Sequence, residues 1–185
     1  MKKILAFALA MTMLLALAAC GKDRVFKSEY ESFSKELASA EAVSFTANVR
    51  AEYEHKTARF ALSYTGDNSG AVVTVLAPEL ISGISARVSP DGTSLEYGEI
   101  SLDTGSLDSH GLSPMSALPV MMRALKSGHL DSYWTEDGKT VLRLIPDDEY
   151  ICTVWFGDEM TPLRAELQSD GRIVVFAQIS DWETA

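Results

Sequence analysis

The stretch Val43-Ser-Phe-Thr-Ala-Asn-Val-Arg-Ala-Glu-Tyr53 decides the fold, because apolar and polar residues alternate along its whole length. A period of two places successive side chains on opposite faces of a β-strand. This strand therefore has one apolar and one polar face. That pattern is typical of an antiparallel sheet with one face open to solvent.

Further strand signals follow along the chain. Residues 58–64 repeat the alternation, and residues 71–77 and 150–156 are apolar strand segments. Asp-Gly pairs at 91–92, 137–138 and 170–171 lie between apolar segments, and Asp-Gly suits the positive φ angles of a type I′ hairpin turn. The strands that they join are predicted at 84–88 with 94–102, 129–135 with 140–145, and 163–168 with 172–179. About nine or ten strands result, without the strand–helix alternation of a parallel sheet.

Two helices are predicted beside the strands. The first is indicated by apolar residues at helical spacing: Phe26, Tyr30, Phe33 and Leu37. The second has Ser113 as N-cap, Pro114 at the first helical position and Gly128 at its end. Pro119 should divide this segment into a short turn and a second helix start. We expect an α+β fold, mostly antiparallel β: an incomplete β-barrel with an N-terminal helix and one internal capping helix.

The first twenty residues have the features of a lipoprotein export signal. Lys2 and Lys3 precede the apolar run 4–17, which is shorter than the roughly 20 residues that span a bilayer. Leu17-Ala-Ala-Cys20 then resembles the lipobox of bacterial lipoproteins, the alternative being an ordinary secretory signal. The resemblance implies cleavage before Cys20 and acylation of its thiol, which anchors the chain in a membrane. We expect a signal peptide at 1–19, a lipidated cysteine with a short tether at 20–22, and one domain at 23–185.

Charge and cysteine content exclude several classes of partner. Removal of residues 1–19 takes away two lysines and no acid, which leaves 14 basic and 26 acidic residues. This excess of acid argues against nucleic-acid binding, which requires basic surfaces. If Cys20 is acylated, Cys152 has no partner for a disulfide. Because Cys152 lies in the apolar run 150–156, we expect it to be a buried apolar residue and not a nucleophile.

No catalytic or metal-binding pattern is found in the sequence. His55, His110 and His129 are scattered, and none has a second ligand at metal-binding spacing. The acidic runs 147–149 and 158–159 lack the spacing of a calcium loop. The sequence therefore predicts no catalytic residue, no metal and no cofactor, and a function that is not enzymatic. A hydrolase or metal enzyme would require the three histidines and the acidic loops to converge.

The order of elements resembles the LolA/LolB-type lipoprotein-carrier superfamily, which includes the mycobacterial LppX/LprG lipoproteins and the N-terminal half of RseB. The segments that carry the resemblance are 43–49, 74–80 ahead of the Asp91-Gly92 hairpin, 150–156, 161–163, 167–173 and 176–182. It implies an open antiparallel barrel, capped by helices, that holds acyl chains in an apolar cavity. The residues expected to line this cavity are Phe45, Val49, Phe60, Leu62, Met121, Met122 and Leu125.

Two functions from different classes follow. The first is a membrane-anchored lipoprotein that binds a lipid or acylated molecule, because flexible Met side chains suit surfaces that repack around apolar ligands. The alternative is an envelope sensor or protein-interaction module with a filled core, in which the same methionines fill gaps. Its partner would be an envelope protein. The signal and the short tether resemble those of Gram-positive Clostridia-type bacteria, so we expect the extracytoplasmic face of their cell membrane.

Overall fold

The computed structural model describes residues 26–53, 56–89, 92–105, 112–147 and 149–185, and Cys20 with its tether lies outside them. The chain forms two compact units, Met1–Glu36 and Leu37–Ala185. All described residues of the first unit are helical, as the spacing of Phe26, Tyr30 and Phe33 predicts, and the helix ends at residue 39. None of the helices that the structure describes is long and apolar enough to span a membrane.

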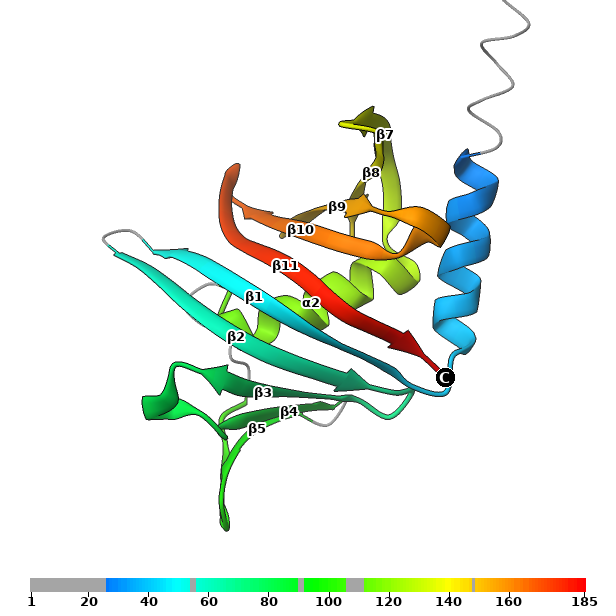
Figure 1. Ribbon diagram of the computed structural model, residues 1–185. Helices are drawn as coiled ribbons and strands as arrows, with labels where there is room; N and C mark the ends of the chain where they lie inside the picture. Colours follow the sequence, from blue (N-terminus) through cyan, green and yellow to red (C-terminus); the bar gives the residue numbers. More distant parts are fainter. Residues whose placement is uncertain (1–25, 54–55, 90–91, 106–111, 148) are drawn as a thin grey trace, which may run out of the picture. The chain divides into compact units, whose positions relative to one another are not determined.

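The second unit contains one antiparallel sheet of eleven strands in the order β6-β5-β4-β3-β2-β1-β11-β10-β9-β8-β7 (Figure 1). The strands are β1 Val43–Tyr53, β2 Lys56–Gly66, β3 Ala71–Ala77, β4 Ser85–Ser89, β5 Gly92–Tyr97, β6 Ile100–Asp103, β7 His129–Glu136, β8 Lys139–Ile145, β9 Tyr150–Phe156, β10 Pro162–Ser169 and β11 Arg172–Thr184. Among the described residues, β6 and β7 each pair on one side only, so the sheet is open. The predicted α+β class with an incomplete barrel is confirmed.

The two faces of the sheet follow from the alternation in β1. Val43, Phe45, Ala47, Val49 and Ala51 are buried, whereas the polar residues between them are partly or fully exposed. Helix α2, Pro114–Ser127, contacts β1, β2, β3, β8 and β10 and lies against the buried side (Figure 1). We call the side that bears Val49 the helix face and the side that bears Arg50 the outer face.

One predicted strand is two strands in the structure. The sequence predicts a single strand at 94–102, but the chain reverses between Tyr97 and Ile100, which are paired across β5 and β6. Gly98 makes this reversal with φ of 59°, a left-handed conformation that glycine adopts without steric cost. The split accounts for eleven strands where nine or ten were expected.

The predicted hairpin turns at 137–138 and 170–171 are confirmed. Asp137 and Gly138 have φ angles of 50° and 76°, and Asp170 and Gly171 have 51° and 73°. These are the positive values that a type I′ turn requires. At the third pair, Asp91 lies outside the described residues, and the flanking strands β4 and β5 pair antiparallel.

The prediction that Pro119 divides the internal helix is wrong. Helix α2 is continuous from Pro114 to Ser127, and Pro119 lies inside it. A proline removes one hydrogen bond, here to the carbonyl four residues earlier, and strains the turn before it. The start of the helix is fixed by Ser113 and Ser116, whose hydroxyls each accept a hydrogen bond of 3.0 Å from the other residue's N–H. This capping box and the burial of the apolar residues keep the helix in one piece.

Candidate functional site

The seven residues expected to line a cavity all lie on the helix face of the sheet or on α2. Phe45, Val49, Phe60 and Leu62 come from β1 and β2, and Met121, Met122 and Leu125 come from α2. Phe60 is half-buried, and each of the other six is 2% exposed or less. Strand register therefore places all four strand residues on the side of the sheet that α2 covers, and six of the seven residues are buried there.

Helix α2 is apolar on nearly every side. Nine of its residues are buried, among them Leu118, Val120, Met121, Met122 and Leu125. Arg123 is exposed, and its guanidinium donates to Asp147 Oδ2 over 2.7 Å. A helix of this kind behaves as part of a core, so its burial against the sheet is the main force that holds it there.

A stack of aromatic rings anchors one part of the helix face. The Phe45 ring stacks on Tyr64 with a centroid distance of 4.8 Å and on Trp182 with 5.2 Å. Burial, and to a smaller extent the nearby carboxylate of Asp67, raises the pKa of Tyr64 to about 12. Tyr64 therefore keeps its proton at physiological pH and serves as an apolar wall with a neutral hydroxyl.

The apolar helix face continues beyond the part that is buried. Strand register aligns one row of residues across six strands: Phe45, Tyr64, Val73, Ala86, Leu95 and Leu102. The first four are buried, Leu95 is half-buried, and Leu102 is 61% exposed. Tyr97 and Ile100, paired with each other on the same face, are 58% and 72% exposed. We call Leu95, Tyr97, Ile100 and Leu102 the open end of the helix face.

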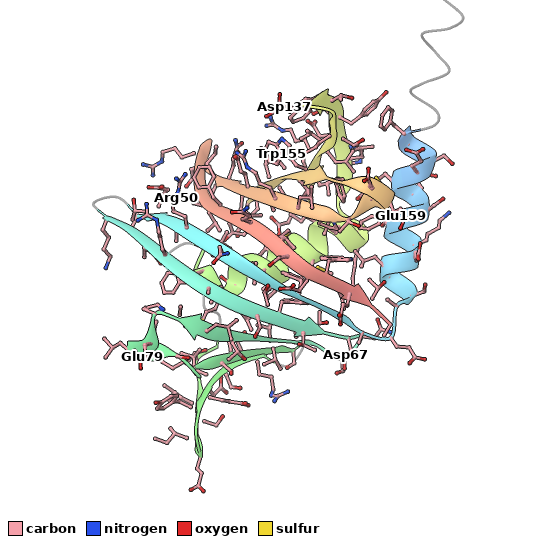
Figure 2. The ribbon with its side chains drawn as sticks, in the orientation of Figure 1. Arg50, Asp67, Glu79, Asp137, Trp155 and Glu159 are labelled. Atoms are coloured by element: carbon pink, nitrogen blue, oxygen red, sulfur yellow. The ribbon has the colours of Figure 1, made fainter. Side chains whose placement is uncertain are left out.

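The outer face carries a different arrangement, in which arginines lie over aromatic rings of neighbouring strands. Arg50 on β1 is paired with Phe176 on β11, and its Cζ lies 3.9 Å from the ring centroid. Arg164 on β10 is paired with Trp155 on β9, with Cζ 4.3 Å from that ring. Figure 2 shows Arg50 and Trp155 projecting from this side of the sheet. Such contacts are attractive and hold a guanidinium in place while leaving its edge accessible.

Two hollows lie beside these arginines. The larger, of about 620 Å³, is lined by residues that include Asn48, Arg50, Lys139, Arg164, Phe176 and Gln178. The smaller, of about 400 Å³, shares Asn48 and Arg50 and is completed by residues that include Arg59, Phe60, Ala61 and Pro78. Among the described residues, neither hollow is lined by an acidic side chain.

The groups that a hydrolase or metal enzyme would need are not assembled in the described part of the chain. His129 is exposed at the start of β7, and His55 and His110 lie outside the described residues. Among the described residues no three His, Cys, Asp or Glu side chains are grouped as metal ligands. Asp147 instead accepts hydrogen bonds from the N–H groups of Glu149 and Tyr150, which shapes its turn.

Cys152 is a free, fully buried thiol on the helix face of β9, as the sequence predicts. Burial raises its pKa to about 12. A thiol with this pKa stays protonated at neutral pH and is a poor nucleophile, because the thiolate is the reactive form.

The paired arginines and aromatics of the outer face were not singled out in the sequence. The alternation around Val49 does place Arg50 on the polar face, and this can be predicted because it depends only on neighbouring residues of the same strand. Nothing local brings Phe176 beside Arg50, because the two residues meet only through the pairing of the first and last strands.

Comparison with known proteins finds similarity in solved structures only; no family model and no curated protein matches the chain. A LolA superfamily protein from Nitrosomonas europaea is 12% identical, with a TM-score of 0.48 over 86% of this chain and 93% of that one. A putative outer membrane lipoprotein-sorting protein domain from Vibrio parahaemolyticus is 11% identical, with a TM-score of 0.47 over 84% and 91%. The lipoprotein LppX from Mycobacterium tuberculosis is 13% identical, with a TM-score of 0.39 over 86% and 96%.

Proposed function

We propose that this chain is a non-enzymatic lipoprotein of the cell envelope that holds a lipid or another acylated molecule against the helix face of its sheet. The observation that carries the proposal is the open end. The row of paired residues is buried at Phe45, Tyr64 and Val73. It stays apolar up to Leu102 on β6, which is exposed. Monomeric proteins seldom leave large apolar side chains together in water unless a ligand covers them.

The proposed mechanism is passive transfer of an acyl chain from water to an apolar surface. Each CH₂ group that leaves water contributes about 0.8 kcal/mol. The acyl chain would first cover Tyr97, Ile100 and Leu102, and would then reach the layer under α2 that contains Met121 and Met122. Thioether side chains adapt their shape at low cost, so that α2 can serve as the lid.

Anchoring completes the proposal. Acylation of Cys20 would hold the domain at the extracytoplasmic face of the membrane, which we take to be the cell membrane of a Gram-positive bacterium. The tether at 20–22 would span only about 10 Å when extended. The lipid-binding surface would therefore work close to the bilayer that supplies its ligand.

Native mass spectrometry of the full-length chain in mild detergent tests the lipid proposal. We expect a lipid adduct on the wild type and its loss in Leu102→Glu and Ile100→Glu, because a carboxylate in the open end opposes burial beside an acyl chain. Leu80→Glu is the matched control, since Leu80 lies in the short helix η1, Glu79–Ile81, outside the row, and is 93% exposed. A wild type without any adduct, or equal loss in all three variants, would contradict the proposal.

A second candidate function, a protein-interaction module with a filled core, is favoured by the burial of six of the seven expected lining residues. In that case the exposed strand β6 would pair with a strand of an envelope protein, because an edge strand presents unpaired backbone groups. A photo-crosslinker placed at Tyr97 in intact cells separates the two functions. Crosslinks to lipid support the carrier, and crosslinks to one protein support the module.

A further inference from the structure

Buried hydrogen-bond donors without acceptors are found on the outer face. Three such atoms occur among the described residues: Arg50 Nε, Arg143 Nε and Trp155 Nε1. Arg50 Nε lies 3.0 Å from Glu52 Oε1 and Arg143 Nε lies 3.5 Å from Asp131 Oδ2, and neither contact has the alignment of a hydrogen bond. All three residues project from the same side of the sheet. Of the three residues, Arg50 lines both hollows, and its side chain is 42% exposed, so the rest of its guanidinium can donate to a ligand that is rich in acceptor atoms.

Positive charge is concentrated at the same place, although the whole chain has a formal net charge of −10. The two hollows are lined by four cations, Arg50, Arg59, Arg164 and Lys139. Arg50 pairs with Glu52 and Arg164 with Glu166, each two residues along its own strand. Arg59 and Lys139 have no carboxylate partner within the described part of the chain. Counted over the residues that the structure describes, the cations around the hollows therefore exceed their paired carboxylates by two.

The cations are also held in position. Arg50 and Arg59 are directly opposite each other on β1 and β2, an arrangement in which like charges repel unless an anion lies between them. The rings of Phe176 and Trp155 support Arg50 and Arg164 from below. A guanidinium fixed in this way matches the tetrahedral oxygens of a phosphate better than a mobile ammonium does.

Two amide side chains also line the larger hollow. Asn48 and Gln178 are paired across β1 and β11, and both line the larger hollow beside Arg50 and Arg164. Amides donate to and accept from hydroxyl groups. At about 620 Å³ the hollow has room for more than one ion, which suits a phosphate that carries a polar alcohol.

We propose that the outer face between β2 and β10 binds a phosphate ester, with Arg50 and Arg164 on the phosphate, Asn48 and Gln178 on the hydroxyls of its alcohol, and Arg59 as a further cation beside Arg50. This site lies on the opposite side of the sheet from the lipid-binding surface proposed above and does not depend on it. Either a phospholipid headgroup or a soluble phosphate ester could supply this chemistry.

Isothermal titration of the full-length chain with glycerol 1-phosphate, at constant ionic strength, tests the site. We expect saturable binding and an affinity about tenfold lower in Arg50→Gln and in Arg164→Gln, the effect of removing one charge-assisted hydrogen bond. Arg87→Gln is the matched control, because Arg87 on β4 has the same kind of surface ion pair, 3.0 Å from Glu96, outside both hollows. Thermal unfolding of each variant shows whether it is folded.

Absence of saturable binding, or equal weakening in Arg87→Gln and Arg50→Gln, would overturn the proposal. A second titration with dihexanoyl phosphatidylglycerol, below its micelle concentration, identifies the source of the phosphate. Tighter binding than glycerol 1-phosphate that Arg50→Gln abolishes assigns a lipid headgroup, and equal affinities assign a soluble ester. Leu102→Glu should leave glycerol 1-phosphate binding unchanged, so the failure of the lipid proposal is distinguishable from the failure of this one.

Discussion

The two faces of the sheet are built from alternate residues of the same strands, yet they differ in almost every physical property. On β1, Val49 is buried on the helix face, while its neighbour Arg50 lies over an aromatic ring on the outer face. The helix face gains stability from apolar area removed from water. The outer face keeps charges and amides accessible. The difference indicates that folding energy comes mainly from one face and that the other is free to carry polar recognition.

The helix face itself is not uniform. From β1 to β4 its central row is buried, and at β6 the same row is exposed. If the helix face served only stability, its strands would carry polar residues at the positions that no other element buries. The apolar open end is therefore the part of the helix face that stability alone does not explain.

The largest expected effect is on the helix face. Leu62→Ala should lower the free energy of unfolding by about 2–5 kcal/mol, because Leu62 is fully buried and truncation leaves a cavity. Arg59→Ala, on the outer face of the same strand, should change it by less than about 0.5 kcal/mol. Urea denaturation of both variants measures the contrast. Equal losses would show that the outer face also contributes to the core.

The next effect concerns alkaline pH. Below pH 9 the Cys152 thiol is protonated in both the folded and the unfolded chain; above it only the unfolded chain releases the proton, because burial raises the folded pKa to about 12. Between about pH 9 and pH 12 the free energy of unfolding should therefore fall by up to about 1.4 kcal/mol per pH unit. Tyr64, with its pKa also raised to about 12, should steepen the fall above pH 10.

Denaturation series at several pH values, with Cys152→Ala as the comparison, measure this slope. In Cys152→Ala the free energy of unfolding should fall less steeply with pH, because the contribution of the thiol is missing. This difference in slope does not depend on how stable the variant is at neutral pH. An unchanged slope between pH 9 and 10 would mean that the thiol becomes accessible before the protein unfolds.

The smallest expected effect is on the outer face. Phe176→Leu keeps apolar bulk but removes the ring beneath Arg50, which should cost about 0.5–1 kcal/mol. A double-mutant cycle with Arg50→Gln isolates the pair. A coupling energy near zero would mean that the ring does not hold the guanidinium.

Much of the fold could be predicted because its signals are local. The alternation of 43–53, the Asp-Gly turns at 137–138 and 170–171, and the helix boundaries at Ser113 and Gly128 each depend on residues within one turn or strand. The errors arose where a local rule was outweighed. The apolar pattern of 94–102 predicts one strand, but Gly98 within it reverses the chain; Pro119 predicts a helix break, but capping and burial keep the helix continuous.

For the candidate sites, too, some features follow from the local sequence and others only from the pairing of strands. The sequence by itself determined which residues are apolar and which face of each strand they occupy, because a period of two follows from backbone geometry. Only the tertiary structure decided which strands are neighbours. Pairing of β1 with β11 sets Phe176 beneath Arg50, and the end of the buried row at β6 leaves Leu102 exposed. Register between strands far apart in the chain depends on packing of the whole sheet, and for that reason the sequence alone could reveal neither the outer-face hollows nor the open end.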